Sequence, residues 1–143
     1  GEVHVVREMK ARGAVLGGEG NGGVIDPALH YGRDAMMGLA LILMHLATSG
    51  QSLSQLKKGY PAYAMVKDKI TFDPTLSPQS LVDKVAEHFK NERLDTRDGL
   101  KIDLDKGWVQ LRKSNTEPIL RIYAEAKTPA EAQSLVQAVK GLL

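Results

Sequence analysis

The stretch LRKSNTEPILRIYAEA, residues 111–126, places hydrogen-bond donors between two apolar segments. The residues that could bind an anion are Arg112, Ser114, Asn115, Thr116 and Arg121. A tight turn can aim successive backbone N–H groups into one concavity that holds an anion. Arginine adds a planar fork that matches phosphate oxygens. These residue types and their spacing therefore indicate a phosphate-binding loop.

A plainer interpretation stays open at this point. Ser, Asn and Thr are common in turns because their side chains hydrogen-bond to nearby backbone. The two arginines could simply solvate a sheet face, and Lys113 is interpreted as a surface charge. The residues alone leave the anion site and the ordinary solvated turn as alternatives.

The strands on either side of this turn must position the arginines. Side chains alternate between the two faces of a strand. Val109 and Leu111 then share one face, opposite Trp108, Gln110 and Arg112. By the same rule, one face carries Leu120, Ile122 and Ala124 and the other carries Arg121, Tyr123 and Glu125. If the aliphatic faces pack on helices, both arginines lie on the open face of the sheet.

A glycine-rich loop, GEGNGG at residues 18–23, follows the short apolar segment 14–18. It satisfies the G-x-G-x-x-G pattern, but a dinucleotide-binding loop leads directly into a helix. Here a helix is expected only from about Arg33, so the context argues against a dinucleotide site. The glycines could instead bring backbone close to a ligand and leave Glu19 and Asn21 projecting toward sugar hydroxyls. A flexible hairpin tip is the alternative.

Catalytic and metal-binding patterns are absent from the sequence. The four histidines show no ligand-like spacing, and there is no cysteine, which excludes disulfide and thiol chemistry. No Ser/His/Asp arrangement can be assembled. The sequence predicts no catalytic residue, no metal site and no cofactor within these 143 residues.

The amino-acid composition limits the kinds of partner that the chain is expected to bind. The apolar content of 43%, the charged content of 25% and the net charge of +2 are typical of a globular protein. Near-neutral charge and 5% aromatic residues argue against nucleic acid. The apolar run 35–47 is shorter than the roughly 20 residues of a membrane span and is interpreted as a helix buried on most sides. No signal peptide is recognised, so we expect a cytoplasmic protein without a membrane partner.

The pattern of elements changes near residue 60. The first part has a helical segment 3–12, a short strand, the glycine loop and the apolar helix, an order typical of the end of an α/β unit. In the second part, Ser77-Pro78 and Thr128-Pro129-Ala130-Glu131 signal the starts of two helices. The expected strands are 62–72, 100–105, 107–114 and 119–126. This order predicts an α+β domain with a small antiparallel sheet and two packed helices.

Two motifs together resemble the C-terminal part of the α-D-phosphohexomutase family, which includes phosphoglucomutases, phosphomannomutases and phosphoglucosamine mutases. They are GGEGNGG with GRDA (residues 32–35) and RKSNTEPILRIYAEA (residues 112–126). The second motif, of the form R-x-S-N/G-T-E-P, is the more specific. The resemblance covers nearly the whole chain. It implies that residues 1–55 are the C-terminal part of an α/β domain three, and that residues 60–143 are the α+β domain four.

The resemblance also implies roles for single residues. Glu19 and Asn21 match the positions that contact sugar hydroxyls, and the phosphate-binding loop matches Arg112, Ser114, Asn115 and Thr116. Arg121 is added from strand geometry. Many family members have Ser in place of Asn21 and His in place of Gly23. The form seen here is similar to phosphoglucosamine-mutase-like and archaeal-type members, which favours glucosamine phosphate as the substrate.

The reaction that the resemblance implies needs more than this chain. A full-length phosphoglucosamine mutase interconverts glucosamine 6-phosphate and 1-phosphate through a bisphosphosugar, with a phosphoserine donor and Mg²⁺ in the first two domains. This chain shows neither motif, so alone it is expected to be inactive and to work with the missing N-terminal domains. The alternatives are a phosphomannomutase or phosphoglucomutase, or a non-catalytic module that binds phosphate or nucleic acid. A sugar-phosphate isomerase would need a base or metal that is not visible.

Overall fold

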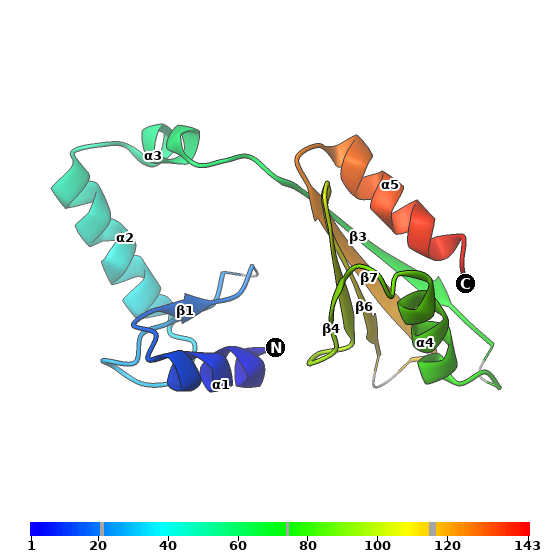
Figure 1. Ribbon diagram of the computed structural model, residues 1–143. Helices are drawn as coiled ribbons and strands as arrows, with labels where there is room; N and C mark the ends of the chain where they lie inside the picture. Colours follow the sequence, from blue (N-terminus) through cyan, green and yellow to red (C-terminus); the bar gives the residue numbers. More distant parts are fainter. Residues whose placement is uncertain (21, 74, 115–116) are drawn as a thin grey trace. The chain divides into compact units, whose positions relative to one another are not determined.

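The computed structural model describes residues 1–20, 22–73, 75–114 and 117–143. The chain divides into two compact units, Gly1–Pro61 and Ala62–Leu143 (Figure 1).

The first unit consists of helices and one short hairpin. Its elements are α1 (Glu2–Arg12), β1 (Gly17–Gly18), β2 (Val24–Ile25), α2 (Ala35–Ser49) and α3 (Leu53–Gly59). The two strands pair antiparallel, with Gly17 opposite Ile25. The strand predicted over 14–18 therefore shortens to two residues. Asp34 caps α2 by accepting a hydrogen bond from the Met37 N–H (2.8 Å), and a capping box of Ser52 and Gln55 starts α3.

Helix α2 is exposed, which corrects the prediction of a helix buried on most sides. None of its residues is fully buried, and Met36 remains 74% exposed and Ile42 45% exposed. Among the described residues its main neighbour is β2, a strand of only two residues. Apolarity alone therefore did not determine burial, because a helix also needs a surface to pack on.

Helix length and apolarity bear on whether the chain could cross a membrane. In the part of the chain that the structure describes, no helix is by itself both long and apolar enough to span a bilayer. Helices α2 and α3 taken together meet the length and composition criteria, with a bend of 87° between them.

The second unit confirms the predicted α+β fold. Its elements are β3 (Ala64–Thr71), α4 (Pro78–His88), β4 (Arg93–Asp95), β5 (Leu100–Leu104), β6 (Gly107–Lys113), β7 (Ile119–Ala126) and α5 (Pro129–Lys140). The strands form one antiparallel sheet in the order β3-β7-β6-β5-β4. Strand β4 was not predicted, since three residues are too few to show an alternating pattern.

One face of this sheet is buried and the other is open. Helices α4 and α5 lie on the same side of the sheet (Figure 1), and their apolar side chains complete the core. The fully buried cluster comprises Val85, Leu100, Ile102, Val109, Leu111, Ile122, Ala124, Val136 and Val139. The alternation predicted for β6 and β7 is therefore confirmed, and the side chains of the opposite parity form the open face.

Candidate phosphate and sugar sites

The connection between β6 and β7 is the predicted anion-binding turn. The Ser114 N–H donates to the Ile119 carbonyl (3.0 Å), and the Ile119 N–H donates to the Glu117 carbonyl (2.8 Å). These bonds close the loop at its base. Ser114 is half-buried and Glu117 is exposed. Asn115 and Thr116, the other predicted loop residues, lie outside the residues that the structure describes.

Arg112 and Arg121 lie directly opposite each other across β6 and β7. Both are exposed, while Leu111 and Ile122, their neighbours in sequence, are fully buried. The prediction that both arginines lie on the open face is thus confirmed. The loop between the strands begins two residues after Arg112 and ends three residues before Arg121.

The Arg112 side chain is oriented by Asp98, a residue that sequence analysis missed. Its Nε lies 3.1 Å from Asp98 Oδ1. Asp98 belongs to the β4–β5 turn, where Gly99 adopts a left-handed conformation with φ +76°. A Cβ at Gly99 would lie 2.2 Å from the Leu111 carbonyl oxygen, so only glycine lets the turn approach β6 this closely. The Asp-Gly pair signals a turn, but only strand register brings that turn to Arg112.

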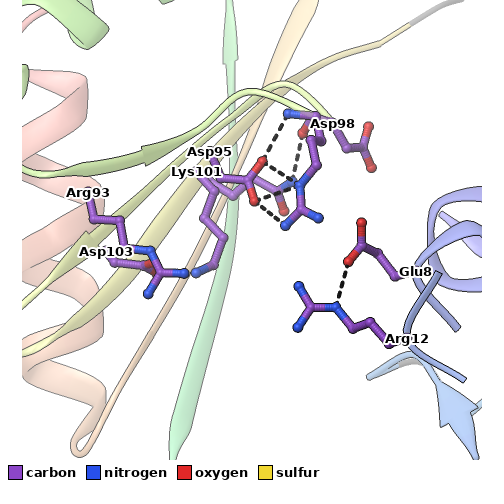
Figure 2. A network of polar contacts seen from close by, with 9 residues as sticks. Glu8, Arg12, Arg93, Asp95, Asp98, Lys101 and Asp103 are labelled. Carbon is purple, nitrogen blue, oxygen red and sulfur yellow. Dashed lines mark hydrogen bonds and ion pairs between the residues drawn. The ribbon is translucent and has the colours of Figure 1, made fainter. Parts of the chain in front are cut away.

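Further charged contacts surround the same turn (Figure 2). Arg97 Nε donates to both carboxylate oxygens of Asp95, at 3.0 and 2.9 Å. These side-chain hydrogen bonds, together with one from the Arg97 backbone N–H, lower the pKa of Asp95 to about 2. Lys101 pairs with Asp103. The Gln110 side chain donates to the Asp98 carbonyl at 2.8 Å, which ties the turn to β6.

The two arginines line different hollows of the surface. Arg112 lines a cavity of about 340 Å³ between the start of α4 and the β4–β5 turn, with a polar lining of Gln79, Asp83, Thr96, Asp98 and Lys113. Arg121 lines a hollow of about 500 Å³ with Lys67, Asp68, Lys69, Glu117, Ile119 and Tyr123. The backbone positions of the two arginines are directly opposite each other, although their side chains line separate hollows.

The glycine loop forms the tip of the β1–β2 hairpin. The Glu19 N–H donates to the Gly23 carbonyl (3.1 Å), and the Gly22 N–H donates to the Glu19 carbonyl (3.0 Å). The Glu19 side chain is only 19% exposed, and its carboxylate lies 3.8 Å from Arg33 Nη1. Glu19 Oε1 also lies 3.1 Å from the Gly1 ammonium. The predicted contact of Glu19 with sugar hydroxyls stays a prediction. Asn21 lies outside the described residues.

Arg33 links this loop to two helices. Its Nε donates to the Glu2 carboxylate of α1 at 2.7 Å, and it stands two residues before α2 begins. A hollow of about 630 Å³ is lined here by Glu2, Gly22, Gly23, Arg33, Asp34 and Ala35. The Met37 backbone N–H and then the His30 side chain lower the pKa of Asp34, so this carboxylate is ionised at neutral pH. Arg33 thus provides a cation beside the predicted sugar-binding carboxylate.

A metal site does not arise from the described residues. Over residues 1–20, 22–73, 75–114 and 117–143, no group of three or more His, Asp or Glu side chains could hold a metal ion. The guanidinium, ammonium, hydroxyl and carboxylate groups around the two loops can bind a ligand through hydrogen bonds and ion pairs.

Comparison with known proteins covers both units. Residues 1–63 match "Phosphoglucomutase/phosphomannomutase, alpha/beta/alpha domain III", and residues 65–142 match "Phosphoglucomutase/phosphomannomutase, C-terminal domain". A "Phosphoglucomutase/phosphomannomutase" of Thermococcus kodakarensis is 40% identical over 96% of this chain and 30% of its own length. A "Phosphoglucosamine/phosphogalactosamine mutase" of Sulfurisphaera tokodaii is 36% identical over the whole chain and 32% of its own length. The chain therefore spans about a third of these relatives.

Solved structures give the same picture. A putative phosphomannomutase from Thermus thermophilus superposes with a TM-score of 0.65 at 26% identity, over 99% of this chain and 29% of that protein. A phosphoglucomutase/phosphomannomutase family protein from Burkholderia thailandensis has a TM-score of 0.73 at 24% identity, over 100% of this chain and 31% of that protein, and shows the shared fold.

Proposed function

Because the chain belongs to the phosphoglucomutase/phosphomannomutase family, we propose that it forms the C-terminal, substrate-binding part of a phosphohexomutase. The proposed substrate is glucosamine phosphate, which the full-length enzyme converts between its 6-phosphate and 1-phosphate forms through a bisphosphosugar. The observation that carries the proposal is the pair of arginines at the base of the β6–β7 loop, opposite each other on the open face.

This arginine pair suits a phosphate dianion. A hydrogen bond to a charged group contributes about 1.5–3 kcal/mol net. Asp98 engages the Nε of Arg112, and a guanidinium has further N–H donors on its two Nη atoms. A mutase must hold either end of the hexose in turn while the other end reacts. A loop that recognises the phosphate rather than the sugar meets that requirement.

In this proposal the glycine loop binds the sugar part of the substrate. The Glu19 carboxylate lies 3.8 Å from Arg33 Nη1, and a carboxylate accepts hydrogen bonds from sugar hydroxyls. Relatives named as phosphoglucosamine mutases support glucosamine phosphate as the substrate. The Thermococcus kodakarensis relative, named phosphoglucomutase/phosphomannomutase, makes glucose and mannose phosphates the competing choice.

The contribution of this chain to the reaction is positioning. Fixing a substrate in line with a reacting group lowers the entropic part of the barrier without any bond chemistry by the binding residues. The phosphoserine and the magnesium-binding loop are proposed to lie elsewhere in the longer protein. Since the described residues offer no cluster of metal ligands, we derive no step through magnesium from this chain.

The test is an assay of the full-length protein by ³¹P NMR, with the 6-phosphates of glucosamine, glucose and mannose as substrates. We expect glucosamine 6-phosphate to be converted fastest. The variant Arg112→Gln should lose about tenfold or more in kcat/KM, mainly through KM, because a charged hydrogen bond is removed.

Arg93→Gln is the matched control for this assay. Arg93 also lies on a strand of the same sheet, but it is 87% exposed and paired with Asp103 at 3.6 Å, far from the β6–β7 loop in the sheet order. Its substitution should leave kcat/KM nearly unchanged. No conversion of any hexose phosphate, or equal kinetics for Arg112→Gln and the wild type, would overturn the proposed function.

A further inference from the structure

Three cations stand in one row across the open face of the sheet. Arg121 on β7 lies directly opposite Arg112 on β6 and directly opposite Lys69 on β3. Like charges at directly opposed positions of neighbouring strands are destabilising. The sheet therefore contains an unfavourable arrangement at the strand ends that carry the predicted phosphate-binding loop.

The rest of the open face follows the opposite rule. Arg93 faces Asp103, Asp95 faces Lys101, and the Trp108 indole N–H donates to Glu125 at 3.1 Å. Among the described residues, no other directly opposed pair on this face carries two charges of the same sign. The like-charged row is thus a local exception and not a general property of the sheet.

Charges within the row are only partly compensated. Asp98 pairs with Arg112. Lys69 and Arg121 have no ion pair with a carboxylate among the residues that the structure describes. Asp68, next to Lys69 in sequence, pairs with Lys140 of α5, whose Nζ donates to its carboxylate at 2.8 Å.

Lys69 and Arg121 also line one hollow of about 500 Å³, together with Lys67 and Tyr123. Lys67 Nζ lies 6.0 Å from the centre of the Tyr123 ring, so it is held over that aromatic face. Two carboxylates also belong to the lining, those of Asp68 and Glu117. Among the described residues, Asp68 pairs with Lys140, and Glu117 forms no ion pair with these cations. Three cations thus face two carboxylates. The hollow therefore carries a net positive charge and is open to solvent.

We propose that Lys69 is a phosphate-binding residue, and that the phosphate group of the substrate lies in this hollow between Lys69 and Arg121. A dianion there offsets the repulsion within the row. The inference rests on the proposed function and deepens it. It adds to the site a residue from β3, more than forty positions before the loop in sequence. The ligand class is a phosphate monoester or inorganic phosphate dianion.

The test measures the binding of inorganic phosphate and of glucosamine 6-phosphate to the 143-residue chain, by ¹⁵N NMR titration. Lys69→Gln should weaken both by about fivefold, the effect of one exposed charge pair. Lys101→Gln is the matched control, since Lys101 lies on the same face, 5.4 Å from the Trp108 ring centre and paired with Asp103. It removes the same charge and should leave both affinities nearly unchanged.

A stability measurement distinguishes binding from a structural role. Without phosphate, Lys69→Gln should keep or raise the melting temperature, because a like-charge contact is relieved. With saturating phosphate, it should gain less stability than the wild type does. A purely structural lysine would instead lower the melting temperature in both conditions.

The outcomes distinguish failure of the role of Lys69 from failure of the proposed function. If Arg112→Gln and Arg121→Gln weaken phosphate binding while Lys69→Gln matches Lys101→Gln, the role of Lys69 is wrong and the proposed function stands. If Lys69→Gln and Lys101→Gln weaken phosphate binding equally, the inference is also refuted, because the effect would then come from the overall charge of the chain. If none of the arginine and Lys69 variants weakens binding, the proposed function itself fails.

Discussion

The two units bury their apolar residues very differently. Among the described residues, the buried hydrophobic side chains of the first unit are Met9 and Ile25, whereas the second contributes thirteen, from β5, β6, β7, α4 and α5. Helix α5 buries Ala132, Val136 and Val139 against the sheet, while α2, the more apolar helix, buries none of its residues fully. The contrast teaches that a helix is buried by a partner surface. The proposed phosphate-binding loop belongs to the unit with the larger buried core, and the proposed sugar-binding loop does not.

The difference in burial between the two units can be tested by shortening the same type of side chain in each of them. Ile122 is fully buried in the sheet of the second unit, and Ile42 is 45% exposed on α2. Ile122→Ala should lower the free energy of unfolding of the second unit by about 4 kcal/mol, through lost burial and a cavity. The fluorescence of Trp108, the only tryptophan, follows that transition in urea.

Ile42→Ala should leave the same Trp108 transition in place, because the lost contacts lie in the other unit and are half exposed. A drop in the urea midpoint as large as that of Ile122→Ala would show that the second unit depends on α2 for its stability. The claim of a self-sufficient core would then be wrong.

Two glycines with the same left-handed backbone conformation provide a second comparison. Replacing them with alanine should change stability less than Ile122→Ala does. Gly99 (φ +76°) and Gly50 (φ +64°) are both left-handed, but a Cβ at Gly99 meets the Leu111 carbonyl oxygen whereas one at Gly50 meets nothing within 4 Å. Gly99→Ala should destabilise the second unit by about 2–3 kcal/mol, since backbone strain and a clash combine. It should also weaken phosphate binding, because it displaces the turn that holds Asp98 against Arg112.

Gly50→Ala is the control for conformation alone. It should destabilise its own helix end by about 1 kcal/mol, visible in the circular dichroism at 222 nm, without moving the Trp108 transition. Equal effects of the two substitutions on the Trp108 transition would mean that the close approach of the β4–β5 turn to β6 has no energetic consequence.

The elements that could be predicted from the sequence are those whose periodic pattern of apolar residues is long. Strands β6 and β7, with seven and eight residues, show the alternation that places Arg112 and Arg121 on the open face. Strand β4 has three residues and was missed, and the strand expected over 14–18 reduces to Gly17–Gly18. Local patterns also misjudged α2, because they contain no information on which surface will cover it.

The missed site residues share one cause. Asp98 and Lys69 reach the arginines only through a turn geometry and a strand register, which link positions far apart in sequence. Glu19 was expected to project, but its side chain is 19% exposed and its carboxylate lies 3.1 Å from the Gly1 ammonium and 3.8 Å from Arg33 Nη1. The arginines could thus be predicted from their residue type and spacing. The residues that orient or complement them could be recognised only in the structure.

The central claim is that the β6–β7 loop and its two arginines bind the phosphate of a sugar phosphate. The most direct test is a ¹⁵N NMR titration of this chain with inorganic phosphate, glucosamine 6-phosphate and glucosamine. We expect the two phosphates to shift the amides of residues 112–121 saturably and glucosamine alone to leave them unmoved. Absence of saturable shifts there, or equal shifts with glucosamine, would contradict the claim.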